Sequence, residues 1–440
     1  MTWRRLLGLS ILSLVACSAG RGDKGTASEK RAAGGPALTA AAPSATGSTA
    51  TADDDAKSTA AALRSVRSVL LLTVDAFRAD QPWTGYTGVR TPYLSALAQR
   101  SVVYSRAYSL ANLTTASLAG MLSGVYPSEL RRDQCAIGHY LLGRGLAPYL
   151  VTSGVHTAAA HGHAIFASKL APSDGFQDWR LIPNAAGMRI TQGSVTGGPT
   201  AALLIDLLQQ QPPDNRFFLW SHFVDPHDAY VAHEGFPPSA DPARGLYDGE
   251  VAYTDHLIGQ VLEALARSPH ASTTAVIVTG DHGEAFAEHG NQRHGFTVYD
   301  EEVRVPLLLF VPGLPPRRID LARSTIDLAP TVTELLGLVP LEHWRGRSLL
   351  QDLRGPSPEP RLVLVDCPEI EQRSAMRAVI DGPTKTILQS GGARVLDLAA
   401  DPKELAPKAG SNKDDVVRRA REVVSRLQMV PGNPCMQSAQ

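Results

Sequence analysis

What this 440-residue sequence lacks narrows its possible functions before any motif is considered. The net charge is −1, so no excess of basic side chains is available for nucleic acid or an acidic membrane surface. Beyond the N-terminus there is no run of eighteen apolar residues, and we expect the folded part not to cross a membrane. The few cysteines show none of the paired spacing that zinc sites use; they are Cys17, Cys135, Cys367 and Cys435.

The first seventeen residues are typical of an export signal. Arg4 and Arg5 supply the positive end, 6–15 the apolar core, and 14–17 (Leu-Val-Ala-Cys) a cleavage box. We expect residues 1–17 to be a bacterial lipoprotein signal whose cleavage leaves Cys17 for acylation. The protein would then be exported and lipid-anchored in the cell envelope, facing the periplasm or on the outer membrane of a Gram-negative host. An ordinary signal peptide with an incidental cysteine is the alternative.

Residues 18–64 are rich in Ala, Gly, Ser, Thr and Pro and poor in large apolar side chains. Such a segment cannot offset the entropy lost on ordering, so we expect a disordered tether. In an exported protein the remaining three thiols could oxidise, but one would be left over. The sequence alone does not give the pairing.

Residues 65–355 alternate short apolar runs with helical patterns. We expect strands near 69–74, 102–104, 217–220, 275–279 and 305–311, and helices near 92–98, 114–123, 203–208, 247–267 and 327–336. This alternation predicts an α/β fold with a doubly wound, mostly parallel sheet and helices on both faces. Residues 356–440 change character, and four short strands followed by a helix predict a small antiparallel sheet with one helix.

Two buried strands are each followed at once by polar residues. Val69–Val74 leads into Asp75, and Ala275–Thr279 leads through a glycine into Asp281 and His282. Open α/β sheets place their ligand sites at the carboxyl ends of parallel strands. The sequence therefore predicts that these three residues meet in a metal site.

Five motifs in this order resemble the sulfatase family of the alkaline-phosphatase superfamily. They are Leu-Leu-Thr-Val-Asp75-Ala-Phe-Arg78-Ala-Asp80, Thr114-Thr-Ala-Ser-Leu-Ala-Gly-Met-Leu-Ser-Gly124, His222-Phe-Val-Asp225-Pro-His227, Thr-Gly-Asp281-His282-Gly-Glu284, and His289 to His294 before Arg304-Val-Pro306. The resemblance covers nearly everything after residue 65. It implies a metal-dependent hydrolase of sulfuric ester, phosphodiester or phosphonate substrates.

The resemblance also implies roles for individual residues. Asp75, Thr114, Asp281 and His282 would hold one divalent metal ion, and Thr114 would be the nucleophile. Arg78 would support the anion or the metal ligands. His222, His227 and His294 would bind the transferring group or protonate the leaving oxygen. Asp80 could be a ligand or a helix cap. The histidines without a partner motif are expected at the surface; they are His139, His156, His161 and His163.

The departures from the family pattern limit the substrate. Sulfatases proper carry a Cys or Ser that becomes formylglycine, followed two positions later by Pro-Ser-Arg, whereas this chain has Thr114 and Leu118. Ala76 also stands where sulfatases commonly have a second acidic ligand. The pattern is closer to the branch that handles phosphodiesters, phosphonates or phosphoglycerol groups. With one carboxylate lost and an imidazole present, Mn²⁺ or Zn²⁺ is favoured over Ca²⁺.

Two other functions compete with the hydrolase. One is an envelope transferase of phosphoglycerol or phosphoethanolamine groups, although such enzymes usually carry several membrane helices. The other is a non-catalytic, lipid-anchored binding protein on a degenerate version of the fold, in which Thr114→Ala would change no activity.

Overall fold

The computed structural model describes residues 52–133, 138, 140–143, 145–167, 173–183, 195–354, 357–370, 373–407 and 413–433. Contacts divide the chain into two units, Met1–Thr49 and Ala50–Gln440. The first unit lies outside the described residues, as do the expected lipoprotein signal, Cys17, Cys135, Cys435 and the expected domain boundary at 355/356. Within the described residues, no helix has both the length and the hydropathy needed to span a membrane.

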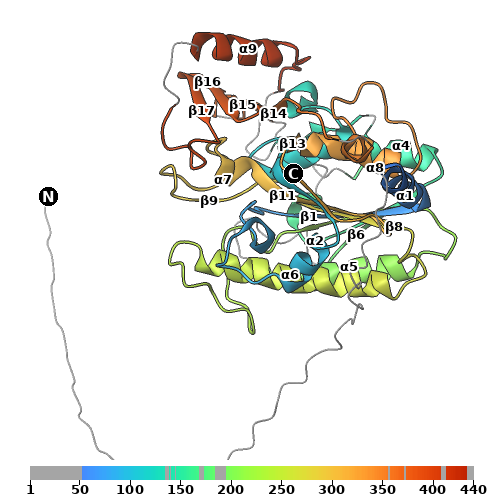
Figure 1. The fold of residues 1–440 in the computed structure, drawn as a ribbon. Helices are drawn as coiled ribbons and strands as arrows, with labels where there is room; N and C mark the ends of the chain where they lie inside the picture. Colours follow the sequence, from blue (N-terminus) through green and yellow to red (C-terminus); the bar gives the residue numbers. More distant parts are fainter. Residues whose placement is uncertain are drawn as a thin grey trace, which may run out of the picture. The chain divides into compact units, whose positions relative to one another are not determined.

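A nine-stranded sheet forms the centre of the described part of Ala50–Gln440 (Figure 1). Its order is β12-β2-β11-β8-β1-β7-β5-β6, with β13 also paired to β2. The strands are β1 (Ser68–Val74), β2 (Val102–Tyr108), β5 (His156–His161), β6 (Asp178–Leu181), β7 (Phe217–Phe223), β8 (Thr274–Gly280), β11 (Arg304–Phe310), β12 (Arg317–Ile319) and β13 (Arg323–Ser324). Only β11 runs antiparallel to its neighbours, so the expected α/β class with a mostly parallel sheet is confirmed.

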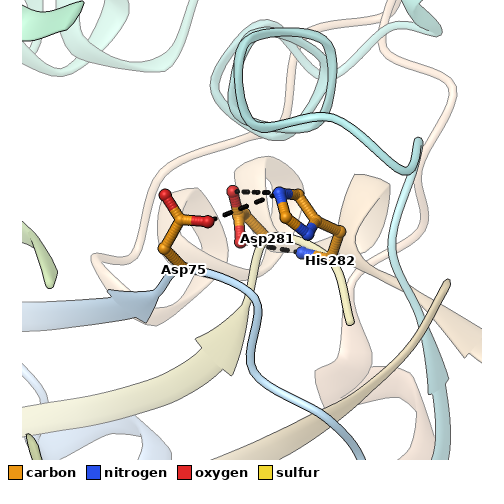
Figure 2. Close-up of side chains that lie close together, drawn as sticks. All are labelled: Asp75, Asp281 and His282. Carbon is orange, nitrogen blue, oxygen red and sulfur yellow. Dashed lines mark hydrogen bonds and ion pairs between the residues drawn. The ribbon is translucent and has the colours of Figure 1, made fainter. Parts of the chain in front are cut away.

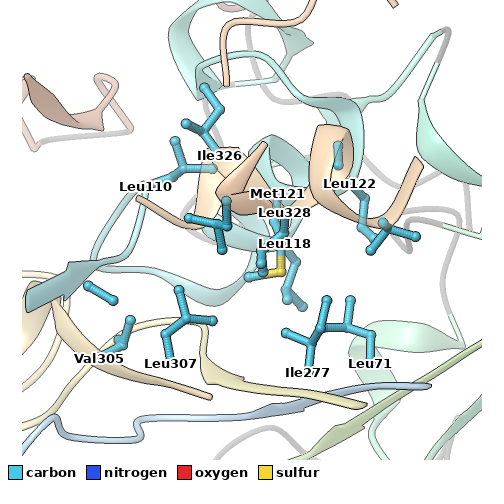
Figure 3. Packing of buried hydrophobic residues seen from close by; sticks show 14 of the residues in the cluster. Leu71, Leu110, Leu118, Met121, Leu122, Ile277, Val305, Leu307, Ile326 and Leu328 are labelled. Carbon is cyan, nitrogen blue, oxygen red and sulfur yellow. The ribbon is translucent and has the colours of Figure 1, made fainter. Parts of the chain in front are cut away.

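The sheet is buried on both faces because its central strands are apolar throughout. On one face Leu70 and Leu72 of β1 pack with α2 (Pro92–Ala98), α5 (Gly197–Gln209) and α6 (Gly245–Ala266). On the other, Leu71 and Ile277 pack with α3 (Thr114–Ser123), α4 (Leu146–Thr152) and α8 (Leu328–Leu335), as Figure 3 shows for α3 and α8. The two apolar clusters fix the sheet rigidly between helix layers.

A second, antiparallel sheet follows the central sheet along the chain, as expected. It has the order β14 (Val363–Cys367), β15 (Met376–Asp381), β16 (Thr384–Gln389) and β17 (Gly392–Asp397). Helix α9 (Lys413–Ser425) covers it through Ala420, which packs on Leu364 and Val379. The remaining elements are short; they are α7 (Asp300–Val303), β3 (Arg131–Arg132) paired with β4 (Tyr140–Leu141), and β9 (Ala285–Phe286) paired with β10 (Gln292–Arg293).

The structure corrects the expected tether at its C-terminal end. Residues 52–64 were expected to be disordered, but α1 (Ala52–Ser65) is a helix. Ala62 and Val66 belong to the core, and Thr59 is buried and accepts a hydrogen bond from Arg317. Because Ala is the best helix former, a composition that resembles a linker also suits a helix once one face has a partner.

Candidate active site

The carboxylates of Asp75 and Asp281 come together because their strands are parallel neighbours. In the pairing of β1 with β8, Val74 stands opposite Gly280, so the next residue of each strand emerges at the same edge. The amides of Ala76 and His282 donate to Oδ1 of Asp281 at 3.3 and 2.8 Å. Ala76 has φ 54°, a left-handed conformation that is costly for a residue with a Cβ. Strain of this kind collects at functional sites.

His282 faces both carboxylates (Figure 2). Its Nδ1 lies 2.9 Å from the carbonyl oxygen of Gly283, which can only accept, so Nδ1 carries the proton and Nε2 has a lone pair. Nε2 lies 3.4 Å from Oδ1 of Asp75 and 3.4 Å from Oδ2 of Asp281. Burial lowers the pKa of His282 to about 3, which keeps the imidazole in the neutral form that binds metals.

These three residues fit a divalent cation. Asp75, Asp281 and His282 are fully or almost fully buried, and one oxygen of each carboxylate accepts no hydrogen bond, Oδ1 of Asp75 and Oδ2 of Asp281. Burial and the neighbouring Asp75 raise the pKa of Asp281 well above its usual value. Buried carboxylates facing each other are unfavourable without a compensating positive charge. Their unpaired oxygens and the unprotonated Nε2 are the mixed oxygen and nitrogen donors that suit such an ion.

Thr114 completes this group at the first residue of α3. Its Oγ1 lies 3.1 Å from Nε2 of His282, and the side chain is partly exposed, unlike the three buried residues. The first turn of a helix offers unpaired N–H groups and a partial positive charge, which favour an anion. The Thr114 side chain is therefore more accessible to solvent than those of Asp75 and Asp281.

A row of three imidazole rings lies beside Thr114. The ring centroids of His282 and His294 are 4.2 Å apart, and those of His294 and His227 are 5.0 Å apart. Nδ1 of His294 donates to Glu284 at 3.1 Å, and Nδ1 of His227 donates to the carbonyl of Asp228 at 2.6 Å. Within the described residues no hydrogen bond engages Nε2 of His227 or His294, so these atoms can accept or hold a proton.

Glu284 orients His294 in this row, and the family resemblance gave it no role. It is fully buried and accepts hydrogen bonds from His294 and from the hydroxyl of Tyr230, at 2.9 Å. Burial raises the pKa of Glu284 to about 7. Its position three residues after Asp281, within the Asp-His-Gly-Glu segment, was the signal that could have identified it.

His222 is fully buried and contacts Asp75. It is buried in β7, with Nε2 3.3 Å from Oδ2 of Asp75 and Nδ1 2.9 Å from the hydroxyl of Thr73. His222 therefore contacts a predicted metal ligand, and His227 and His294 are the histidines that lie toward solvent.

Arg78 and Asp80 belong to a separate charged network. The Arg78 guanidinium donates to Asp80, to Glu288 at 2.8 Å and to the backbone carbonyl of Glu284. Asp80 also pairs with Arg244 at 2.8 Å. These contacts tie Arg78 to the backbone of Glu284, three residues after Asp281. Asp80 pairs with arginines, lies outside the cluster of Asp75, Asp281 and His282, and is not the N-cap of the short helix that follows, which is Gln81.

Two of the four histidines expected at the surface are buried instead. His161 is fully buried between Phe166, Trp179 and Trp220, and His163 is 4% exposed. Burial lowers the pKa of His163 to about 4, although the charge of Asp75 raises it in part. The expectation was wrong for these two because β5, which carries them to the carboxyl edge beside β7, was not recognised. His156 is half-buried, and His139 lies outside the described residues.

The sequence of this chain is similar to those of known proteins. The family model described as Sulfatase matches residues 67–338. Choline-sulfatase of Rhizobium meliloti (strain 1021) is 24% identical over 412 residues, covering 74% of this chain and 79% of the relative. Arylsulfatase K of Gallus gallus is 27% identical over 219 residues, covering 45% of this chain. This chain spans only 41% of the length of that relative.

Solved structures share the fold. The phosphonate monoester hydrolase of Agrobacterium radiobacter has a TM-score of 0.63 and 21% identity, covering 82% of this chain and 95% of its own. A structure described in complex with its substrate D-glucosamine-2-N,6-O-disulfate has a TM-score of 0.66 and 16% identity, covering 82% of this chain and 97% of its own. At these identities the likeness establishes the fold alone.

Proposed function

Because this chain belongs to the sulfatase family, we propose that it is a metal-dependent hydrolase of sulfuric ester, phosphodiester or phosphonate substrates with Thr114 as its nucleophile. The observation that carries the proposal is the placement of the Thr114 hydroxyl 3.1 Å from Nε2 of His282, beside the unpaired oxygens of Asp75 and Asp281. The match to the Sulfatase family model and the similarity to choline-sulfatase support ester hydrolysis as the reaction class.

The same residues would hold the ion and prepare the nucleophile. Asp75, Asp281, His282 and Thr114 would bind one divalent cation, with Mn²⁺ or Zn²⁺ favoured by the donor set. When bound, the cation would neutralise the carboxylates, polarise the ester and lower the pKa of the Thr114 hydroxyl. The chain itself supplies the remaining groups: the N-terminus of α3 for the anion and the free Nε2 atoms of His227 and His294 for the proton.

The proposed reaction consists of two successive displacements at sulfur or phosphorus. Oγ1 of Thr114 forms a bond to the central atom while its proton passes to a neighbouring imidazole. The bond to the leaving oxygen breaks, and that oxygen takes the proton from the imidazolium. Water then attacks the Thr114 ester, gives its proton to the imidazole, and the proton returns to Oγ1 as the second bond breaks.

The identity of the nucleophile favours phosphonate and phosphodiester substrates. A threonine side chain cannot become the aldehyde of formylglycine. Free Thr114 must therefore be regenerated by attack of water on the sulfur or phosphorus atom of the Thr114 ester. We therefore expect phosphonate and phosphodiester turnover to exceed sulfate ester turnover.

Activity of purified protein tests this function. Wild type, Thr114→Ala, Thr114→Ser and Asp281→Ala would be assayed on aryl sulfate, bis-aryl phosphodiester and aryl phosphonate, with metal content measured on the same samples. We expect one transition metal per wild-type chain, loss of turnover by a factor of about 10³ or more in Thr114→Ala, and partial activity in Thr114→Ser. Ester turnover that survives Thr114→Ala would show that the nucleophile is misassigned.

We also propose that the enzyme is exported and anchored through a lipid on Cys17. The charged start, the apolar stretch and the Leu-Val-Ala-Cys box support this. Membrane fractionation of cells that express wild type or Cys17→Ser tests it, and equal recovery in the soluble fraction would contradict it.

A further inference from the structure

The loop that follows His294 is held firmly beside Thr114. The amides of Phe296 and Thr297 donate to the buried carboxylate of Glu302 at 3.1 and 3.0 Å, and the Thr297 hydroxyl donates at 2.6 Å. Asn112, two residues before Thr114, donates to the carbonyl of Thr297 at 2.6 Å. The loop is therefore fixed to the residues that precede α3, and Phe296 within it is 45% exposed.

Arg373 reaches this loop from the C-terminal subdomain. It lies between β14 and β15, where its amide donates to the carbonyl of Ile370 at 2.8 Å. Its Nη1 donates to the carbonyl of Gly295 at 2.7 Å, and its guanidinium carbon lies 4.6 Å from the ring centroid of Phe296. A cation over an aromatic face is held in orientation while its N–H edge stays available.

Gly295 shows how close Arg373 lies to the nucleophile. A Cβ at this position would lie 2.6 Å from Nη1 of Arg373 and 2.9 Å from Cδ2 of Leu113, the residue before Thr114. Gly295 has φ 85°, which also disfavours any side chain there. Arg373 and Leu113, the residue before Thr114, therefore both pack against Gly295.

The charge of Arg373 is not compensated within the described chain. Arg78 pairs with Asp80 and Glu288, and Arg293 pairs with Asp228 at 3.1 Å. Arg373 is exposed and forms no ion pair with a described acidic residue, and its Nε and Nη2 have no described hydrogen-bond partner. An unpaired guanidinium with two parallel N–H groups matches the geometry of a carboxylate.

We propose that Arg373 and Phe296 form a subsite that binds a carboxylate carried by the leaving group of the ester. This inference rests on the ester hydrolysis proposed above and specifies its substrate class. The reacting ester would lie between Thr114 and His294, and the leaving alcohol or phenol would extend past Gly295 to the guanidinium. The C-terminal subdomain would then select substrates for a catalytic fold that lies in another part of the chain.

Paired substrates test the subsite. Phenyl and 4-carboxyphenyl methylphosphonate would be assayed with wild type, Arg373→Gln, Arg373→Lys and Phe296→Ala. We expect Arg373→Gln to lower kcat/KM for the carboxylated ester about 10- to 100-fold more than for the neutral ester, with partial recovery in Arg373→Lys. Phe296→Ala should cause a smaller loss of the same preference. Arg418→Ala, an exposed arginine of α9 paired within its own helix, is the matched control and should change neither ester.

Equilibrium binding separates failure of the subsite from failure of the proposed reaction. Calorimetry would compare 4-hydroxybenzoate with phenol on wild type and Arg373→Gln. Preferred binding of 4-hydroxybenzoate that is lost in Arg373→Gln supports the subsite even if neither ester is turned over, an outcome that would count only against the reaction. Equal losses on both esters, or equal binding of both phenols to wild type, would overturn the subsite.

Discussion

At the scale of single residues, the site depends on groups that hold other groups in place. Glu284 accepts from Nδ1 of His294 and from Tyr230, and the neighbouring His282 fixes its own tautomer on a backbone carbonyl. Partners of this kind typically change metal affinity or activity by about 10- to 100-fold when they are removed. The chemistry is therefore distributed over more residues than those that would touch the ester.

Glu284→Gln tests this positioning. The amide can still accept from one partner, but it can no longer hold both His294 and Tyr230 as a carboxylate does, so the imidazole loses its fixed orientation. We expect kcat to fall about 10- to 100-fold with a smaller change in KM, and the metal content to stay near that of wild type. Steady-state kinetics with metal analysis measure both.

Glu288→Gln is the matched control for that measurement. Glu288 lies four residues further along, is half-exposed and contacts Arg78 instead of the histidines. We expect at most a few-fold change. A KM effect alone in Glu284→Gln, or equal losses in the two variants, would mean that Glu284 does not position His294.

At the scale of elements, Asp255 of α6 fixes the start of α2. Its carboxylate accepts from the amides of Leu94 and Tyr93 at 2.7 and 3.2 Å, although it is almost fully buried and forms no ion pair with a described basic residue. Burial raises the pKa of Asp255 to about 7, and the two amide hydrogen bonds offset only part of this rise. The folded protein therefore holds a proton on Asp255 at pH values where the unfolded chain has released it.

Asp255→Asn should flatten the dependence of stability on pH. A raised folded pKa gives a stabilising contribution that is complete below the unfolded value of 3.8 and is lost as pH rises through about 7. The asparagine keeps an acceptor for the amides but cannot ionise. We expect the free energy of unfolding of wild type to fall more than that of the variant between about pH 4 and pH 7, as measured by urea denaturation.

A substitution of an exposed carboxyl provides the control. Asp206 of α5 is half-exposed and hydrogen-bonds Arg180, so Asp206→Asn should follow the wild-type pH curve. If the curves for wild type and Asp255→Asn were parallel, folding would not raise the pKa of Asp255.

Strands and helices with strong apolar patterns were predictable, and small-residue elements were not. The strands around Asp75 and Asp281 are Val- and Leu-rich and were placed within a residue or two of β1 and β8. Strand β5 consists of His-Thr-Ala-Ala-Ala-His, in which Thr157 is the only β-branched side chain and three alanines give no strand pattern, and its burial comes from β7 beside it. The position of His163 could not be predicted for the same reason: it depends on tertiary packing and not on local pattern.

At the scale of the whole described fold, a buried ionic cluster joins the antiparallel sheet to the catalytic part. Lys385 of β16 is fully buried, and its Nζ lies 2.8 Å from Asp300 of α7 and 2.8 Å from Glu404. Burial alone would lower the pKa of Lys385, but the two carboxylates raise it above its usual value. The segment anchored by Asp300 continues into Glu302, which holds the Phe296 loop.

Lys385→Met should destabilise the whole protein and weaken the site. The substitution leaves Asp300 and Glu404 facing each other with only the Arg304 guanidinium, 3.9 Å from Asp300, as a cation, and removal of one partner from a buried ion pair costs about 3–5 kcal/mol. We expect the midpoint of denaturant unfolding to fall accordingly. At temperatures where the variant is folded, the preference for carboxylated esters should also decrease, because the loop that carries Phe296 loses its support.

Arg418→Met on α9 removes only exposed pairs and should leave both properties near wild type. If Lys385→Met unfolds at the wild-type midpoint, or loses stability while it keeps the full substrate preference, the antiparallel sheet does not support the active site through this cluster.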